Sequence, residues 1–381
     1  PVSGKKVLVR VDFNVPLQDG KVADDTRIRE SLPTIEYLLK QNAAVILCAH
    51  LGRPKGTVNP KYSLEPAAKR LGELLKKEVL FARDCVGPEA VKVTGVMKPG
   101  QVCLLENLRY HPEEEKNVES FAKDLASLAE VFVQDAFGAV HRAHASTSAV
   151  TKFLDSSAGL LLQKEVQALG AILQNPPKPF VAILGGAKVS DKLGVIQNLL
   201  SKTDALFVGG AMAYTLLKAQ GRKVGNSLIE ADKIDLAKSL LGPKLHLPLD
   251  HRIADKPEAG SPSSVTEGQD IPDGKLGVDI GPKSSVKVSE LLKGANTILW
   301  NGPMGIFEIP EFAQGTMECA KSIANATEQG AFSVVGGGDS VSALKKSGLS
   351  AKISHISTGG GASLEFLEGK LLPGIQPLIE N

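Results

Sequence analysis

Short apolar runs, each followed by a helical pattern, constrain the fold of this chain more than any other feature. In the first half they are VLVRVDFNV, AVILCAHLG, QVCLLENL and VFVQDAF, and in the second half PFVAILGG, DALFVGG, NTILWNGP, FSVVGGG and ISHISTGGG. Unbroken apolar strands alternating with helices are typical of parallel sheets covered on both faces. Because this succession occurs twice in 381 residues, the sequence predicts an α/β protein with two doubly wound parallel-sheet domains.

The boundary between the two domains is expected near residues 158–178. The stretch GLLLQKEVQALGAIL has apolar residues at helical spacing and ends before Asn175-Pro176-Pro177, which a helix cannot easily cross. A helix that leads into a proline stop predicts a connector between domains. Residues 259–275 (AGSPSSVTEGQDIPDGK) are predicted to form a surface loop or a hairpin.

Composition excludes several classes of protein. The net charge of +2 gives no reason to expect binding to nucleic acid or to a membrane surface. The four cysteines form no CxxC pair, which argues against a disulfide framework or a structural zinc site. No apolar run approaches the roughly 18 residues of a membrane span, and no secretion signal is visible. We therefore expect a cytoplasmic protein.

Arginine is distributed unevenly along the chain. Eight of the ten arginines precede residue 158: Arg10, Arg27, Arg29, Arg53, Arg70, Arg83, Arg109 and Arg142. The rigid fork of arginine suits bidentate capture of phosphate or carboxylate, whereas the second half relies on lysine and glycine. The two halves are therefore expected to bind different ligands.

Polar residues of the first half gather where the predicted strands end. They are Asp12, Asn14, Arg27, His50, Arg53, Arg109, Asp135, His141, Arg142 and His144. Ligands of open α/β sheets sit beyond the carboxyl ends of the strands. Four strand ends that deliver basic residues to one rim predict a binding site for a polyanion.

The histidines of FGAVHRAHAS allow more than one interpretation. His141 and His144 could bind a metal with Asp135 or His50, but the neighbouring arginines would repel a cation. A structural role is the alternative. We interpret both histidines as supporting members of a basic rim, partly charged near neutral pH. Whether either touches the ligand is left open.

The second half carries glycine-rich turns that precede helices. Lys188 and Lys192 are four residues apart, so on a helix they would share one face, where a bound phosphate would offset their repulsion; a solvated lysine pair is the alternative. Two further runs, 336–338 and 359–361, permit close approach of a phosphate-rich ligand. Asp339 could hold Mg²⁺ or cap a helix.

Familiar nucleotide and hydrolase fingerprints are missing. The chain contains no GxxxxGK[ST], GxGxxG, HExxH or GxSxG. A nicotinamide dehydrogenase would require GxGxxG, and a periplasmic anion-binding protein would require a secretion signal. The retained arginines, lysines and Asp339 argue against a catalytically inactive scaffold.

The motifs together closely resemble the phosphoglycerate kinase family. They are RVDFNVP, HLGRPKG, LLENLRY, DAFGAVHRAHAS, AILGGAKVSDK, DIGPKS, WNGPMGIFE, VVGGGDS and STGGGASLEFLEGK, and they span the whole chain. The resemblance implies two Rossmann-like domains joined by a helix and hinge. Domain 1–157 would bind 3-phosphoglycerate, 158–177 would connect, 178–363 would bind nucleotide, and 364–381 would pack back onto the first domain.

The resemblance also assigns roles. Arg27, Lys188, Gly337 and Gly360 would be catalytic, and 3-phosphoglycerate would contact Asp12, Asn14, Arg27, His50, Arg53, Arg109 and Arg142. ATP or ADP would contact Gly186, Lys188, Lys192, Gly209, Gly210, Asn301, Gly302, Pro303, Glu308, Gly336, Gly337, Gly338, Asp339 and Ser340, with Mg²⁺ on Asp339.

The implied reaction is reversible, Mg²⁺-dependent phosphoryl transfer between ATP and the carboxylate of 3-phosphoglycerate. It would form 1,3-bisphosphoglycerate and ADP after hinge closure and would need no general base, because a carboxylate is already ionised. In glycolysis it would run towards ATP. The resemblance implies a cytoplasmic monomer without nucleic-acid or membrane partners.

Overall fold

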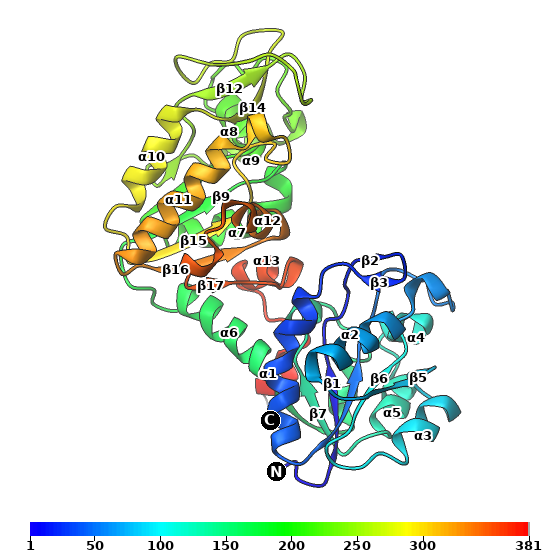
Figure 1. Cartoon of the computed structure of the whole chain (residues 1–381). Coiled ribbons are helices and arrows are strands. Elements are labelled where there is room, and N and C mark those ends of the chain that lie inside the picture. Colours follow the sequence, from blue (N-terminus) through cyan, green and yellow to red (C-terminus); the bar gives the residue numbers. More distant parts are fainter. Residues whose placement is uncertain (380–381) are drawn as a thin grey trace. The chain divides into compact units, whose positions relative to one another are not determined.

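The chain forms two compact units (Figure 1). The computed structural model describes residues 1–379, so the last two residues of the predicted segment 364–381 lie outside the described part. The first unit comprises Pro1–Gln167 and the chain from Leu371 onward, and the second comprises Ala168–Lys370. Their boundary falls inside helix α6 (Leu160–Leu173).

The first unit is built on a six-stranded sheet in the order β5-β6-β4-β1-β7-β8, with every neighbouring pair parallel. The strands are β1 (Lys6–Arg10), β4 (Ala44–Cys48), β5 (Val79–Ala82), β6 (Val102–Leu105), β7 (Val131–Gln134) and β8 (Asp155–Ala158). The predicted parallel sheet is confirmed. The sequence analysis missed β5 and β8, which lie at the two edges of the sheet and are less buried than the inner strands; β8 (DSSA) is largely exposed.

Helices cover both faces of this sheet because successive strand side chains point to opposite faces. Val7 and Val9 pack with helices α1 (Thr26–Lys40) and α2 (Glu65–Leu75). Leu8 packs on the other face, with α3 (Pro88–Thr94) and α5 (Glu119–Ala126). The unit also contains β2 (Leu17–Gln18), β3 (Lys21–Val22), η1 (Pro60–Tyr62), η2 (Leu108–Tyr110), α4 (Pro112–Glu115), η3 (Phe137–Ala139), η4 (Ala149–Lys152) and α14 (Gln376–Ile379).

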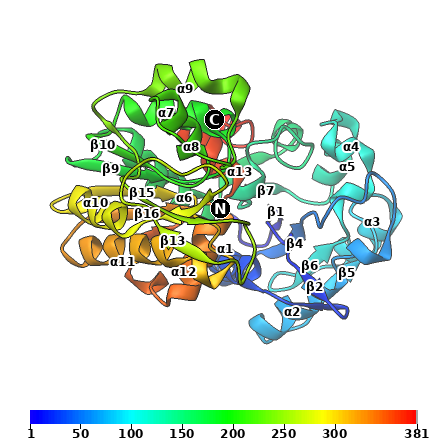
Figure 2. The ribbon, with the colours of Figure 1, turned by 90° about the horizontal axis from the view of Figure 1, so that it is seen from above.

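The second unit repeats this plan with the strand order β11-β10-β9-β15-β16-β17, again all parallel. Figure 2 shows α7 (Val189–Leu200), α8 (Met212–Ala219) and α9 (Ile234–Leu240) on one face of the sheet, and α10 (Pro282–Leu292), α11 (Gln314–Glu328) and α12 (Gly338–Ser347) on the other. The strands are β9 (Phe180–Leu184), β10 (Ala205–Val208), β11 (Leu245–His246), β15 (Thr297–Asn301), β16 (Phe332–Gly336) and β17 (His355–Ile356). The fully buried Trp300 lies in the core beneath α10 and α11.

A small antiparallel sheet, β13-β12-β14, supplements the second unit. Its strands are β12 (His251–Ala254), β13 (Ser263–Val265) and β14 (Leu276–Ile280), so the stretch 259–275 contributes the second strand of a hairpin followed by a loop. The remaining elements are η5 (Ala231–Lys233), η6 (Pro310–Phe312), η7 (Ser350–Lys352) and α13 (Gly361–Leu367). Within the described residues, no helix is both long and apolar enough to span a membrane.

The helix expected from GLLLQKEVQALGAIL is present as α6, and its first turn is anchored in the first unit. The Asp135 carboxylate, at the end of β7, accepts hydrogen bonds from the backbone N–H of Leu161 (3.0 Å) and Leu162 (3.3 Å). The Thr34 hydroxyl accepts one from Leu160 N (2.9 Å). Burial raises the pKa of Asp135 to about 7, although these hydrogen bonds act in the opposite sense.

The last described residues return to the first unit. Gly374 N donates a hydrogen bond to Val140 O (2.8 Å), and the side chains of Leu372 and Ile375 are buried. A side chain at position 374 would collide with Val140, because an added Cβ would lie 2.8 Å from its Cα.

Candidate functional site

The predicted anion-binding residues lie beyond the carboxyl ends of the first unit's strands. The sheet extends from β1 to β4 on one side and to β7 on the other, and a reversal of this kind leaves a crevice at the strand ends. Asp12 and Asn14 follow β1, His50 and Arg53 follow β4, Arg109 lies in η2 after β6, and Arg142 follows η3 after β7. Arg27 lies in the first turn of α1.

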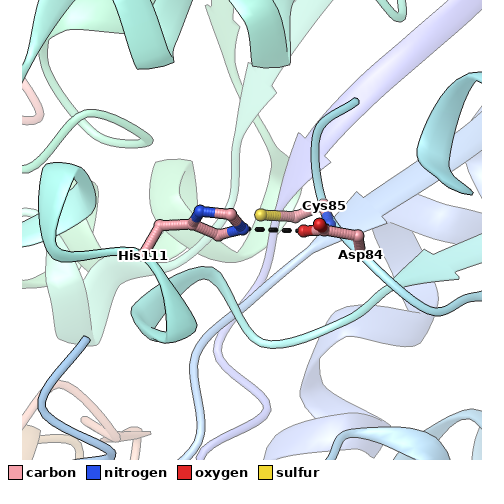
Figure 3. A group of neighbouring side chains, drawn as sticks. All are labelled: Asp84, Cys85 and His111. Atoms are coloured by element: carbon pink, nitrogen blue, oxygen red, sulfur yellow. Dashed lines mark hydrogen bonds and ion pairs between the residues drawn. The ribbon is translucent and has the colours of Figure 1, made fainter. Parts of the chain in front are cut away.

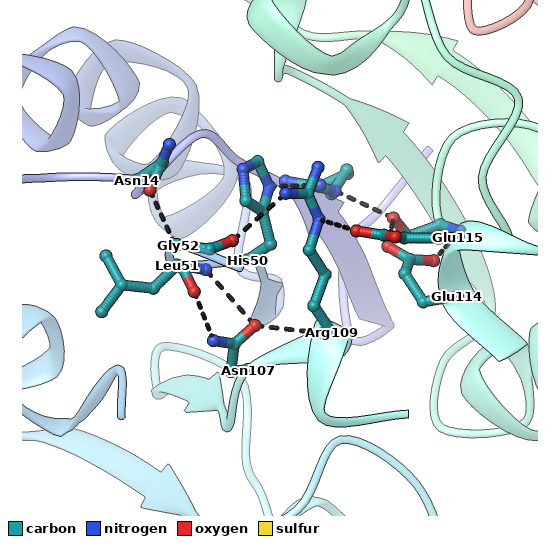
Figure 4. A network of polar contacts seen from close by, with 10 residues as sticks. Asn14, His50, Leu51, Gly52, Asn107, Arg109, Glu114 and Glu115 are labelled. Carbon is teal, nitrogen blue, oxygen red and sulfur yellow. Dashed lines mark hydrogen bonds and ion pairs between the residues drawn. The ribbon is translucent and has the colours of Figure 1, made fainter. Parts of the chain in front are cut away.

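Direct contacts join three of these loops (Figure 4). Arg27 Nη1 donates to Asn14 O (2.9 Å) and lies 3.3 Å from Asp12 Oδ1. Asn14 Oδ1 accepts a hydrogen bond from Gly52 N (2.9 Å), and Arg109 Nη1 donates to Gly52 O (3.2 Å). The loops after β1, β4 and β6 are therefore held together before any ligand binds.

Asn107 fixes the direction in which Arg109 leaves its strand. Its Oδ1 accepts from Arg109 N (3.0 Å), and its Nδ2 donates to Leu51 O (2.8 Å), as Figure 4 shows. The Arg109 guanidinium also lies 3.1 Å from Glu115 Oε1. A buried amide with several partners leaves Arg109 little freedom of position, which favours binding of a rigid anion.

Arg10 is a site component that the sequence analysis missed. It lies at the end of β1, fully buried, and donates through Nε to Ser146 Oγ (2.9 Å) and through Nη1 to Val11 O (2.6 Å). Its Nη2 lies 3.0 Å from His50 Nδ1. Because a guanidinium can only donate, His50 Nδ1 must accept, which places the imidazole proton on Nε2. The sequence does contain a signal for this role, because Arg10 is a charged residue at the end of a largely apolar strand.

The buried cation is balanced by a buried carboxylate. Ser146 Oγ donates to Glu114 Oε2 (2.6 Å), and Ser146 N donates to Glu114 Oε1 (2.8 Å). Glu114 has no exposed surface. Arg10, Ser146 and Glu114 thus form a continuous polar chain beneath the basic rim, and we call it the Arg10 network.

The electrostatics of the rim favour an anion but differ from the expectation for the histidines. Burial, followed by the charge of Arg109, lowers the pKa of His144 to about 4, and burial with Arg10 lowers that of His50 far below its usual range. His144 is therefore neutral near pH 7, and the expectation of partial charge is wrong for it because desolvation and the neighbouring positive charges all disfavour the protonated ring. Burial, with the charges of Arg10 and Arg142 adding to it, also lowers the pKa of Arg109. Arg53 and Arg142 are exposed.

In the second unit, the strand order reverses between β9 and β15, which places the turns after these strands side by side. Gly185 N donates to Asn301 O (2.9 Å). A Cβ on Gly185 would lie 1.9 Å from Pro303 O, and one on Gly302 would lie 2.0 Å from Gly185 O. Only glycine permits this approach of the two backbones.

A pocket of about 530 Å³ opens beside these turns. Five of the predicted nucleotide-binding residues line it: Gly186, Gly210, Pro303, Glu308 and Asp339. Most of its remaining wall is apolar and was missed from the sequence, because it comes from Tyr214, Leu228, Pro257, Leu276, Val278 and Ile306 on unrelated segments. Gly209 packs beside Met304 and does not line the pocket. An apolar pocket with a few polar groups suits a flat ring system.

The two predicted lysines do not share a helical face, which corrects the sequence analysis. Lys188 has extended backbone angles (φ −125°, ψ 126°) and precedes α7, whereas Lys192 lies inside the helix. Lys192 Nζ donates to Asn301 Oδ1 (2.8 Å) and to Gly185 O. Burial lowers the pKa of Lys192 to about 8. The chain is still extended at Lys188 after the glycine turn, and α7 begins only at Val189. The four-residue spacing of Lys188 and Lys192 therefore does not place them on one helical face.

The glycine run 336–338 leads into α12. Gly337 (φ 89°) occupies the N-cap position, so Asp339 lies in the first helical turn and is not the cap. The Asp339 carboxylate is exposed at the wall of the pocket, where a hard oxygen ligand suits Mg²⁺ that also binds phosphates. Ser340 is buried and accepts a hydrogen bond from Gly302 N (2.6 Å). Gly360 (φ 52°) precedes α13.

Comparison with known proteins shows to which family this chain belongs. The family model described as phosphoglycerate kinase matches residues 1–370. The chain belongs to the phosphoglycerate kinase family. It is 56% identical over 392 residues to the phosphoglycerate kinase of Koribacter versatilis, covering 99% of this chain and 97% of that one. It is 54% identical over 386 residues to that of Pelotomaculum thermopropionicum, covering 100% and 98%.

Solved phosphoglycerate kinases have the same fold. The structure from Coxiella burnetii superposes with a TM-score of 0.90 at 41% identity, covering 100% of this chain and 97% of that one. The structure from Pyrococcus horikoshii OT3 gives 0.86 at 33% identity, covering 99% and 96%. In this member of the phosphoglycerate kinase family, the arginine-rich residues lie in the first unit and the pocket lies in the second.

Proposed function

We propose that this chain transfers a phosphoryl group reversibly between ATP and the carboxylate of 3-phosphoglycerate, producing 1,3-bisphosphoglycerate and ADP. In glycolysis this reaction runs towards ATP. The observation that carries the proposal is the division of the site, with an arginine-rich crevice in one unit and an apolar pocket beside glycine turns in the other. Membership of the phosphoglycerate kinase family supports it.

The first unit supplies the acid-binding residues in this proposal. Arg27, Arg109 and Arg142 bind the phosphate and carboxylate of 3-phosphoglycerate through the bidentate hydrogen bonds that a guanidinium forms with such anions. His50 donates from Nε2, the atom on which the Arg10 network keeps the proton. Asp12, Asn14 and Arg53 complete the set.

The second unit supplies the nucleotide-binding residues. The apolar wall of the pocket holds the base, Glu308 bonds the ribose, and Lys192 neutralises phosphate charge. Phosphoglycerate kinases use ATP or ADP as substrate and Mg²⁺ as cofactor; here Asp339 would hold the ion, which neutralises charge on the nucleotide phosphates. Asn301 positions Lys192, and Ser340 positions the Gly302 turn.

The chemistry needs positioning and charge stabilisation without a general base. The attacking carboxylate is ionised at neutral pH. Arg27 and Lys188 stabilise the negative charge on the phosphoryl group in flight, and backbone N–H groups at Gly337 and Gly360 assist. The two ligands belong to different units, so transfer requires the units to bring them together about the α6 connector.

We further propose that the enzyme acts as a cytoplasmic monomer without nucleic-acid partners. The near-neutral net charge of +2 supports the absence of nucleic-acid binding. Sedimentation at micromolar concentration should give a single species of about the mass of one chain, 40.2 kDa.

The depressed pKa of Lys192 predicts a pH dependence of nucleotide binding. As pH rises through about 8, Lys192 loses its charge, and the Kd for MgADP measured by calorimetry is expected to rise. Between pH 8 and 10.5 the unfolded chain holds a proton that the folded, ligand-free chain has lost, so this group makes stability increase with pH there. The Lys192→Arg variant, charged throughout, should lack this rise in Kd. The same rise in that variant would contradict the assignment.

A coupled spectrophotometric assay with MgATP and 3-phosphoglycerate tests the proposed function. We expect turnover that requires both substrates and Mg²⁺. Arg142→Ala, an exposed residue of the first unit, should raise KM for 3-phosphoglycerate more than tenfold and leave the Kd for MgADP unchanged. Absence of turnover in the wild-type protein would refute the proposed function.

A further inference from the structure

Three side chains of metal-binding type converge in the first unit without any role in the proposed reaction (Figure 3). Asp84 and Cys85 lie in the turn between β5 and α3. His111 lies between η2 and α4, where it precedes Pro112. The two turns are 26 positions apart in the sequence, so a search for closely spaced cysteines and histidines does not find them.

The donor atoms of this cluster already point toward one another. His111 Nε2 lies 2.7 Å from Asp84 Oδ1, and the donor atoms of all three residues lie within 4.8 Å of one another. Figure 3 shows the Cys85 sulfur beside the His111 ring, on the same side as the Asp84 carboxylate. Zinc bonds of about 2.0–2.3 Å place neighbouring tetrahedral ligands roughly 3.3–3.7 Å apart. Shifts of about 1 Å would therefore bring these atoms onto one ion.

The charges around the cluster favour a cation. The Asp84 carboxylate belongs to the cluster itself, and the carboxylate of Glu113 acts electrostatically on His111 from nearby. Glu113 Oε2 is buried, and it has no hydrogen-bond partner among the described residues. A buried carboxylate oxygen without a partner is costly, and the positive charge of a cation bound at His111 would reduce that cost electrostatically.

We propose that Asp84, Cys85 and His111 form a binding site for a zinc-class divalent cation. The oxygen, sulfur and nitrogen donors are all ligands that Zn²⁺ binds, whereas Mg²⁺ prefers oxygen ligands alone, so the sulfur and the nitrogen select against it. Binding replaces the thiol proton of Cys85, and any second proton on His111, and both protons pass to solvent. Thiolate, carboxylate and neutral imidazole then balance the two charges of the ion.

The position of the cluster suits a solvent ligand at the fourth coordination site. The His111 side chain is 29% exposed and that of Asp84 39%, whereas Cys85 is fully buried. The buried Cys85 sulfur would thus bind the ion from the protein interior, and a water molecule could bind it from the solvent side. It would join the turn that follows β5 to the turn that follows η2.

Titration of the metal-free protein with Co²⁺ tests this site, in excess Mg²⁺ so that hard-ligand sites are filled. A thiolate-to-cobalt charge-transfer band at one equivalent is the expected result, and Zn²⁺ should abolish it by displacement. Cys85→Ser should remove the band, and His111→Gln should weaken Zn²⁺ binding by more than about 100-fold, since even outer partners of metal ligands contribute 10–100-fold. His111 is partly exposed, so its variant tests the site even if Cys85→Ser fails to fold.

The matched control is Cys319→Ser, which removes a buried thiol from the second unit. It should leave the cobalt band and the Zn²⁺ affinity unchanged. The proposal is overturned if saturating Co²⁺ gives no thiolate band in the wild-type protein. A band that persists in both Cys85→Ser and His111→Gln would overturn it equally.

Discussion

Replacement of Arg27 by alanine is expected to lower kcat by on the order of 10³-fold or more, because an arginine directed at a transferring phosphoryl group has an effect of this size in related enzymes. Stability should change little. The Arg27 side chain is 40% exposed, and its ion pair with Asp12 is partly solvated, so its loss should cost at most about 1 kcal/mol. Turnover in the coupled assay and urea denaturation measure the two effects separately.

Arg29 provides a matched control for this experiment. It lies two positions further along α1, is 56% exposed and pairs with Asp25, so Arg29→Ala removes the same charge from the same helix without touching the loops after β1 and β4. We expect its kcat to equal that of the wild-type protein. Lys188→Ala in the second unit should resemble Arg27→Ala. Normal turnover in Arg27→Ala would remove this residue from the catalytic group.

Replacement of Arg10 by methionine should destabilise the first unit by about 3–5 kcal/mol, the usual result of leaving a buried charge without its partner. The guanidinium is fully buried and has three hydrogen-bonding partners, and its loss leaves Glu114 as an uncompensated buried carboxylate. The only tryptophan, Trp300, lies in the second unit. Hydrogen exchange of the β1 and β4 amides therefore measures the effect better than fluorescence.

Two variants separate the charge effect from packing. Arg83→Ala removes an exposed arginine paired with Glu65 and should cost less than about 1 kcal/mol. The double variant Arg10→Met with Glu114→Gln removes both buried charges, so its loss of stability should be smaller than the sum of the single losses. Additive losses would show that the Arg10 network is not electrostatically coupled.

The sequence predicted the architecture well because apolar strands and helical periodicity are local properties. Both parallel sheets and the helix of GLLLQKEVQALGAIL were expected and are observed. Strands β5, β8 and β11 lie at sheet edges and are only partly buried, so they lack the unbroken apolar run of the inner strands, and their assignment depends on pairing with a neighbour. Of the four edge strands in the two parallel sheets, β17 alone was predicted, because a glycine run follows it.

The sequence predicted the positions of charged residues at strand ends, whereas properties that depend on burial could not be read from it. Residues such as Arg27 and Asp339 follow strands or glycine turns, and topology alone brings them to the crevice edges. The neutral state of His144 and the depressed pKa of Lys192 follow from desolvation, which depends on distant packing. The apolar pocket wall gave no local signal, because its residues come from segments spread over residues 214–306.

The return of the C-terminus to the first unit has a consequence for the order of events during synthesis. Gly374 bonds to Val140, and Leu372 and Ile375 are buried, so the first unit lacks part of its own packing until these residues have been synthesised. The second unit, contiguous from Ala168 to Lys370, is complete earlier. The first unit therefore depends on residues that are synthesised only after the whole of the second unit, and a chain without the residues from Leu371 onward would lack this part of the first unit's packing.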